Sequence, residues 1–301
     1  MSIFLTEQER EHIDAQRKYE PVNRFYWALL RRVEQRAQSP GLINFDTTVH
    51  WWHTALEYMT DAAMAYALKP QHDIGIWLRD TTLSLIRRST DDWVGPWFRK
   101  HDTDEPLGHL ETAHLCMAVA VSLDLAPDVF TEAEREEIRT KLRDEGIPMC
   151  LRWLRNMKRL NNWAAIMTFG LAGAAAVLDD LEAMQQAVHY FKLSAEAFQP
   201  DGSYSESLQY GNYAAMGLML AYEALTRRDP SLAEQLSVLP YAQGVPWAVA
   251  SYFYKKPLPG WGVYPLPRSA NFNDSGAIYR PGADVLLHIA VRAKDVLPTE
   301  A

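Results

Sequence analysis

Side chains suited to proton transfer and to anion binding occur in four short segments of the chain. These are the string HWWH at 50–53, the string LETAH that ends at His114, the string NNW at 161–163 and the tyrosine-rich DGSYSESLQYGNY at 201–213. Tyr and His side chains give and take protons, whereas Asn and Arg side chains donate hydrogen bonds to carboxylates. Together, these residue types can hold an acidic ligand and move a proton on it.

Helices must position nearly all of these side chains, because apolar residues recur at helical spacing along most of the chain. Thr131 and Glu134 form a capping-box pattern at the start of one helix. The expected helices are 6–18, 21–37, 48–68, 74–89, 109–123, 132–154 (interrupted near Gly146 and Pro148), 163–178, 181–198, 209–227, 231–252 (broken at Pro240) and 282–294.

Strand signals are sparse, and the Pro- and Gly-rich stretch 255–281 is predicted to be a long irregular loop at one rim of a cleft. About eleven helices joined by short links, without a heptad seam, indicate stacked helical hairpins. We therefore predict an all-α fold, with one domain over 1–301 that forms a complete or incomplete (α/α) toroid.

The overall charge limits the class of partner. With 38 acidic and 30 basic residues, the chain has a net charge of -8, which argues against nucleic acid or an acidic membrane as a partner. An acidic polymer is also repelled at long range, so binding one requires a local basic patch. Such a patch precedes the helix expected at 163–178, although a run of charges is also typical of a solvated helix face. Its members are Arg152, Arg155, Lys158 and Arg159.

Other features of the composition leave several questions open. The 10 Trp and 14 Tyr residues suit either a core or a groove that stacks sugar rings. Cys116 and Cys150 fall within helical patterns and are expected to be buried thiols rather than a disulfide. No cofactor or metal pattern is apparent. The first residues do not resemble a signal peptide and no apolar run spans a membrane, so a cytoplasmic location and a periplasmic or secreted one after processing both remain open. The oligomeric state is open as well.

Three segments resemble, in order and spacing, the heparinase II/III-like polysaccharide lyases of the alginate lyase and heparinase superfamily. They are GHLETAHLCMAVAVSLDL at 108–125, NNWAAIMTFGLAGAAAVL at 161–178, and QPDGSYSESLQYGNYAAMGLMLAYEAL at 199–225 with the later loop NFNDSG at 271–276. The likeness covers about 108–290 of the chain. It implies a helical toroid, often followed in the family by a β-sandwich that has no expected counterpart here. It also implies β-elimination at a uronic acid of an anionic polysaccharide.

The resemblance assigns roles in that elimination, which needs a neutralised carboxylate, a base for the C5 proton and an acid for the leaving oxygen. Asn162 matches the family asparagine that neutralises the carboxylate. Tyr210, at the end of the pattern D-G-x-x-x-E-x-x-x-Y, matches the family tyrosine that serves as base and acid. Asn162 is equally suited to cap the helix that follows it, and Tyr210 to a place in the core. Both alternatives stay open.

Trp163 stands where some branches of the family have a histidine, so His114 is expected to fill the third catalytic role. His50 and His53 have the spacing of a shared metal site on a helix but no third ligand, and a structural role is an alternative for each of these histidines. We expect the sugar to be bound by Asn161, Trp163, His53, Trp52, Tyr204, Glu206, Tyr213, Arg268 and Asp274.

Two other functions compete with the lyase. A glycoside hydrolase on the same kind of toroid would need two carboxylates about 5–10 Å apart. The candidates for that pair are Asp201, Glu206, Asp274 and Glu111. A glycan-binding protein without catalysis would keep the aromatic rings and leave the asparagine and tyrosine idle. A saturated product, an unsaturated product and no product distinguish the hydrolase, the lyase and the binder.

Overall fold

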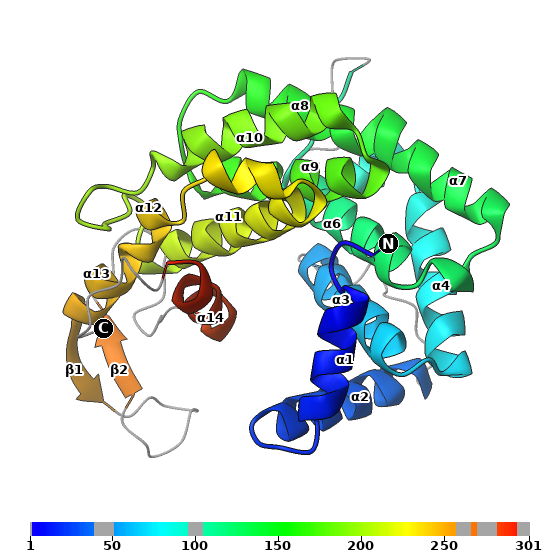
Figure 1. Ribbon diagram of the computed structural model, residues 1–301. Coiled ribbons are helices and arrows are strands. Elements are labelled where there is room, and N and C mark those ends of the chain that lie inside the picture. Colours follow the sequence, from blue (N-terminus) through cyan, green and yellow to red (C-terminus); the bar gives the residue numbers. More distant parts are fainter. Residues whose placement is uncertain (1, 39–50, 96–104, 257–265, 270–281, 294–301) are drawn as a thin grey trace.

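The computed structural model describes residues 2–38, 51–95, 105–256, 266–269 and 282–293. Its helices form an arc (Figure 1). In chain order they are α1 (Glu7–Gln16), α2 (Val22–Gln38), α3 (Trp51–Leu68), α4 (His72–Ile86), α5 (Thr90–Val94), α6 (Leu110–Leu125), α7 (Glu132–Lys141), α8 (Ile147–Asn156), α9 (Asn162–Leu178), α10 (Leu181–Ala195), α11 (Leu208–Arg228), α12 (Leu239–Ala242), α13 (Gly244–Ala250) and α14 (Ala283–Arg292).

Helices α3 and α6, which lie side by side within the arc, run in the same direction. The ring of His53 lies 4.5 Å from that of His114 near the start of both helices. Beyond the middle of α3 and after the end of α6, the Tyr66 hydroxyl donates to the Asp128 carboxylate at 2.8 Å. Because the histidine contact comes before the Tyr66–Asp128 contact along both α3 and α6, the two helices are parallel.

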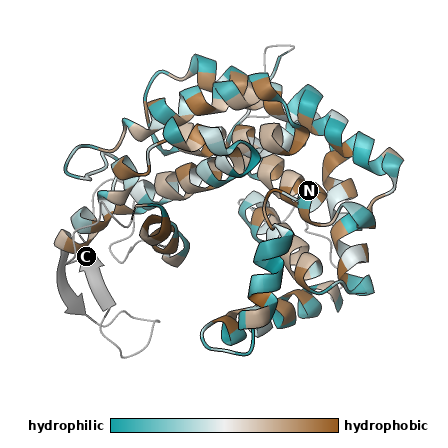
Figure 2. Cartoon of the chain, in the orientation of Figure 1, coloured by the Kyte–Doolittle hydropathy of each residue, from teal (hydrophilic) through white to brown (hydrophobic). Residues whose placement is uncertain are grey.

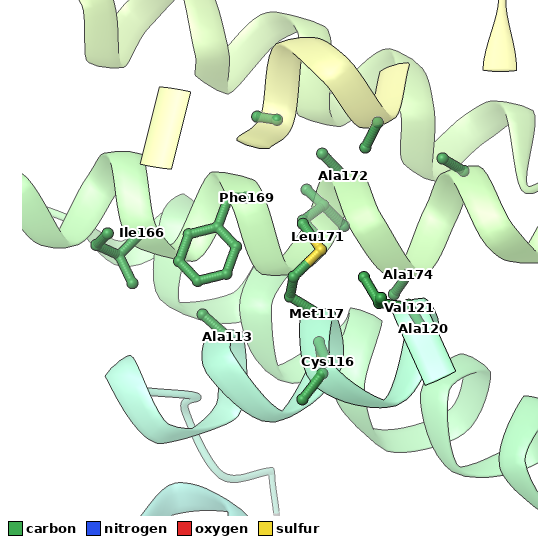
Figure 3. Close-up of a cluster of buried hydrophobic side chains, with 14 of the residues drawn as sticks. Ala113, Cys116, Met117, Ala120, Val121, Ile166, Phe169, Leu171, Ala172 and Ala174 are labelled. Atoms are coloured by element: carbon green, nitrogen blue, oxygen red, sulfur yellow. The ribbon is translucent and has the colours of Figure 1, made fainter. Parts of the chain in front are cut away.

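Helix α9 continues this parallel set on the other side of α6. A Cβ atom on Gly170 would lie 2.4 Å from the Cα of Ala113, and one on Gly173 would lie 2.7 Å from the end of Met117. The glycines therefore let the two helices approach closely, with Met117 and Phe169 among the apolar side chains packed around their contact (Figure 3). Nearly every side chain of α6 and α9 is buried.

Helices α11 and α14 complete the parallel set. Glu206, just before α11, accepts a hydrogen bond from the start of α9, and Arg228 at the far end of α11 pairs with Asp179 after α9. Asn212 bonds to Gly282 at the start of α14, and Glu223 pairs with Arg292 at its end. The antiparallel return paths are made by α4, by α7 with α8, and by α10 (Figure 1). The N-terminal ends of α3, α6, α9 and α11 therefore lie on the same side of this set of parallel helices.

The predicted all-α fold is confirmed. Hydrophobic residues concentrate on the helices inside the arc, while hydrophilic residues predominate on α1 and α7 (Figure 2). The part of the chain described here contains one antiparallel pair of strands, β1 (Tyr252–Lys256) and β2 (Leu266–Ser269), and no β-sandwich. No helix among the described residues is long and apolar enough to cross a membrane.

The structure corrects three local expectations. The helix expected over 231–252 is replaced by a 3-10 turn (Pro230–Glu234), α12, α13 and the start of β1, because prolines interrupt it. The loop expected over 255–281 contains most of the β1–β2 pair. The interruption expected near Gly146 is instead a π-helical turn (Leu142–Gly146) that joins α7 to α8. Glycine is required there because a Cβ atom would lie 2.6 Å from the Cys116 sulfur.

Candidate active site

The start of α9 holds a tight cluster of polar groups. Asn161 caps this helix, since its Oδ1 accepts the N–H of Ala164 at 3.3 Å, so Asn162 is the first helical residue rather than the cap. The backbone N–H of Asn162 donates to Glu206 Oε2 at 2.7 Å, and its Nδ2 donates to Oε1 at 3.1 Å and to Oε2 at 3.0 Å. A carboxylate is thereby held at a helix N-terminus, where the helix dipole favours negative charge.

His114, on the neighbouring α6, is fully buried and held by two hydrogen bonds. Its Nδ1 lies 2.7 Å from the carbonyl oxygen of Leu110, and its Nε2 lies 3.2 Å from the Tyr213 hydroxyl. Because a carbonyl only accepts, Nδ1 carries the proton, and the neutral ring accepts the Tyr213 proton on Nε2. Burial, with the nearby His53, lowers the pKa of His114 well below its ordinary value. The histidine is therefore a neutral, fixed acceptor.

Tyr213, on α11, bonds to His114 and is also within range of the charge of the buried Glu111. Burial and the charge of Glu111 raise the pKa of Tyr213. Glu111 is only 2% exposed and lies against Gly95, where a Cβ atom would come within 2.3 Å of its carboxyl group. From the sequence, Glu111 was assigned only to the competing hydrolase. Its place three residues before His114 on a helix, and so on the same side, was the signal that linked it to this cluster.

Tyr210 lies one helical turn before Tyr213, at the start of α11, and is half-buried. Its backbone N–H donates to the Oγ of Ser207, the N-cap, at 3.3 Å. Ser207 has a φ of 143°, a conformation that costs a non-glycine residue about 1–3 kcal/mol. Strained backbone of this kind concentrates at functional sites, and here it fixes the junction between Glu206 and Tyr210.

Two of the expected sugar-binding residues are packed inside the protein. Trp52 is 3% exposed, with its ring 4.6 Å from that of His114, and Tyr204 is 2% exposed. Burial and the charge of Glu206 raise the pKa of Tyr204. Both rings are therefore packed in the interior, where neither presents a face for stacking on a sugar. His53 is exposed, and its ring lies 5.7 Å from that of Tyr213, so it remains accessible to a ligand.

Trp163 is half-buried, with its ring 6.1 Å from that of Trp153 and 5.7 Å from that of His109. Arg268 lies on β2 opposite Tyr254, and the positions of Asp274, Asn271 and His50 are outside the described residues. Among the described residues, no group of three or more His, Cys, Asp or Glu side chains could hold a metal ion. The two cysteines are buried free thiols.

Of the four basic residues expected before α9, one forms a hydrogen bond within the protein and three are exposed. Arg152 is half-buried and its Nε donates to the Pro106 carbonyl at 2.9 Å. Arg155, Lys158 and Arg159 are exposed, and they occupy the end of α8 and the short link to the start of α9. Three cations thus lie close in sequence to the helix start that holds Asn162. They can offset the negative charge of the molecule locally for an acidic ligand.

Residues 107–237 match the family model for alginate lyase. The matched segment is less than half of the chain, and it indicates a likeness to polysaccharide lyases of the alginate lyase family. It runs from just before α6 to just after the 3-10 turn that follows α11, and so it contains His114, Asn162, Glu206, Tyr210 and Tyr213. The match supports β-elimination in an anionic polysaccharide as the general chemistry. No curated protein matches the chain.

Proposed function

We propose that the protein cleaves a uronic-acid polysaccharide by β-elimination at the N-terminal ends of α6, α9 and α11, with Asn162 and Tyr210 acting on the sugar. The observation that carries the proposal is the meeting of the start of α9, bearing Asn162, with the start of α11, bearing Tyr210. Both lie inside the segment that matches the alginate lyases. Alginate and the substrates of heparinase II/III-like enzymes are therefore the first polymers to test.

The carboxylate of a uronate must be neutralised before its C5 proton becomes acidic enough to remove. The start of α9 offers two kinds of help: the Asn162 amide and the positive end of a 17-residue helix. The exposed cations at 155–159 add long-range attraction. With the carboxylate neutralised, a base removes the C5 proton, the electron pair forms the C4–C5 double bond, and the O4 leaving group takes up a proton.

Tyr210 is better suited than Tyr213 to move those protons. Tyr213 already donates its hydroxyl proton to His114, and burial together with Glu111 raises its pKa. His114 is completely buried, which favours a positioning role through Tyr213 over direct contact with the sugar. Tyr210 lies one turn nearer the helix start, three residues after the strained N-cap Ser207 that follows Glu206. We therefore assign Tyr210 as both base and acid.

The positions of the described carboxylates do not favour a hydrolase that acts through two paired acids. Asp201 is exposed and accepts the N–H of Ser203 at 2.9 Å, and the hydrogen bonds from Ser203 lower its pKa, which makes it a poor proton donor. Glu206 is bound to Asn162 rather than presented opposite a second acid.

The decisive experiment follows near-ultraviolet absorbance while the protein is incubated with alginate, hyaluronan and heparan sulfate, with Tyr210→Phe as the matched control. A lyase produces a conjugated C4–C5 double bond that absorbs there, so absorbance rises with one polymer and stays flat with the variant. New saturated reducing ends without absorbance would establish the hydrolase. Binding of a polymer without any product would establish the glycan-binding protein.

A further inference from the structure

The donors that we assign to the substrate carboxylate already hold a carboxylate of the protein itself. Glu206 accepts the backbone N–H of Asn162 at 2.7 Å and its side-chain amide at 3.0 and 3.1 Å. The charge, the planar shape and the two oxygens of this group are those of a uronate carboxylate. A second acidic group cannot use the same N–H groups at the same time, since both carboxylates are acceptors and repel each other.

We propose that Glu206 is an internal competitor for the uronate site, so that the substrate binds by exchanging its carboxylate for that of Glu206. This inference rests on the proposed role of Asn162 in binding a uronate. It adds a regulatory contact: in the free protein the site is closed by its own side chain, and only an acidic group that competes with Glu206 opens it.

The surroundings allow Glu206 to leave. Its side chain is half-buried, so water is near enough to solvate the displaced carboxylate. The next residue is Ser207, with its φ of 143°, and a strained link next to a charged side chain is one that a small movement can relax. Asn162 stays in place because its side chain is 3% exposed and its backbone belongs to α9.

Asn162 carries a second sign of an incomplete site. Its Oδ1 is buried and has no hydrogen-bond partner among the described residues. The acceptor-only Glu206 orients the amide so that Nδ2 faces the carboxylate and Oδ1 points away from it. A buried amide oxygen without a donor costs free energy, and a sugar hydroxyl next to a bound carboxylate would supply that donor. Glu206 thus provides an acceptor for the Nδ2 group of Asn162 but no donor for its Oδ1 atom.

The competition has a measurable size. An internal competitor lowers the apparent affinity of a ligand in proportion to the fraction of molecules in which the site is open. Glu206→Gln keeps the shape of the side chain but removes the charge, so it weakens the hydrogen bonds to Asn162. We expect the dissociation constant for glucuronate to fall by roughly tenfold in this variant, as the open fraction rises.

The test is an equilibrium titration of the full chain with glucuronate by calorimetry. Glu206→Gln is compared with the natural protein and with Glu196→Gln, which removes one exposed charge at the end of α10 and controls for general electrostatics. Glu206→Asp, which keeps the charge but is one methylene shorter, carries the test if the glutamine variant does not fold. It should give a smaller gain. A double variant with Asn162→Ala should abolish the gain.

Equal or weaker binding by Glu206→Gln would overturn the proposal, as would the same gain in Glu196→Gln. A kinetic readout separates the two possible roles of Glu206. Removing a competitor lowers KM, whereas removing a residue that only orients Asn162 lowers kcat. The titration needs no turnover. Tighter glucuronate binding by Glu206→Gln without lyase activity would therefore contradict the proposed function and support the internal competitor. Lyase activity without tighter binding would do the reverse.

Discussion

Two hydrogen-bonded tyrosine–histidine pairs occupy two regions of this molecule, and they differ in the group that the second ring nitrogen of the histidine contacts. At the candidate active site, Tyr213 bonds to Nε2 of His114 at 3.2 Å, and Nδ1 meets a backbone carbonyl. Between α12 and α14, Tyr241 bonds to Nε2 of His288 at 2.8 Å, and Nδ1 lies 3.1 Å from a carboxylate oxygen of Glu223. The first pair is backed by an uncharged group and the second by a charged one.

The carboxylate behind the second pair belongs to a larger ionic network. Glu223 also pairs with Arg292 of α14 and with Arg227 of its own helix, and Arg227 pairs with Glu9 of α1. The network therefore ties α1, α11 and α14 together near the C-terminal half of α11. Its charges are matched within the protein, whereas the donors at the start of α9 hold the Glu206 carboxylate, which we propose a ligand displaces. We infer that the first region serves turnover and the second holds the arc together.

The largest effect that this comparison predicts is on turnover in Tyr210→Phe. Loss of the proposed proton-transferring hydroxyl should slow β-elimination by about 10²–10⁴-fold, the usual contribution of general acid–base catalysis. The midpoint of urea unfolding should stay close to that of the natural protein, since the half-buried ring is retained.

Tyr241→Phe is the matched control for that experiment, as it removes a buried phenol hydroxyl from the other pair. Turnover per folded molecule should be unchanged by it. If both variants lost activity equally, or if Tyr210→Phe remained fully active, the division of labour between the two regions would be wrong.

The second effect, on stability, comes from Glu223→Gln. Removing this carboxylate leaves Arg292, Arg227 and His288 without their shared partner. Breaking a buried ion pair costs about 3–5 kcal/mol, and the partial exposure of this group reduces the expected loss to about 2–3 kcal/mol. Urea unfolding measures it. Unchanged stability, or a loss of turnover in the fraction that stays folded, would contradict the structural role of the network.

The sequence predicted the fold well because helices depend on local patterns. The amphipathic repeats and the Thr131 capping box gave helices close to those found. The failures lie where the pattern was ambiguous or the contact was distant. Asn161 and Asn162 are equally good caps, so local propensity could not decide which of them begins α9. After residue 230, prolines and aromatics carried no period, and the β1–β2 pair was missed.

The site was predicted as a set of residue types but not as an arrangement. The contact between Glu206 and Asn162 joins positions 44 apart in sequence, and that between Tyr213 and His114 joins positions 99 apart. Neither follows from periodicity, because each depends on how parallel helices pack. The burial of Trp52 and Tyr204 was likewise hidden, since a large ring in a sequence suits a core as well as a sugar-binding surface.

The third effect separates the two regions by pH. The pKa of His114 lies well below its ordinary value of 6.5, so below about pH 6.5 the unfolded chain binds a proton that the folded protein does not. Stability should fall on acidification from there by up to about 1.4 kcal/mol per pH unit. The hydrogen bonds of Glu223 lower its pKa below 4.5, so its contribution is complete above pH 4.5 and is lost as pH falls further.

Urea unfolding at a series of pH values distinguishes these losses. His114→Asn should remove its share of the slope just below pH 6.5, and Glu223→Gln its share below pH 4.5. If His114→Asn left the upper slope unchanged, His114 would titrate normally in the folded protein and the neutral pairing with Tyr213 would be wrong.

The smallest effect belongs to Tyr213→Phe. The variant keeps the ring and leaves Nε2 of the buried His114 without its donor, which should cost about 1–2 kcal/mol of stability. Turnover should fall only modestly, because we assign this hydroxyl to holding the site rather than to the sugar. Parallel unfolding and turnover measurements on Tyr213→Phe and Tyr210→Phe check both statements. A loss of turnover in Tyr213→Phe as deep as that predicted for Tyr210→Phe would move the proton transfer to the Tyr213–His114 pair, and a neutral buried histidine would then be the acceptor that activates the tyrosine.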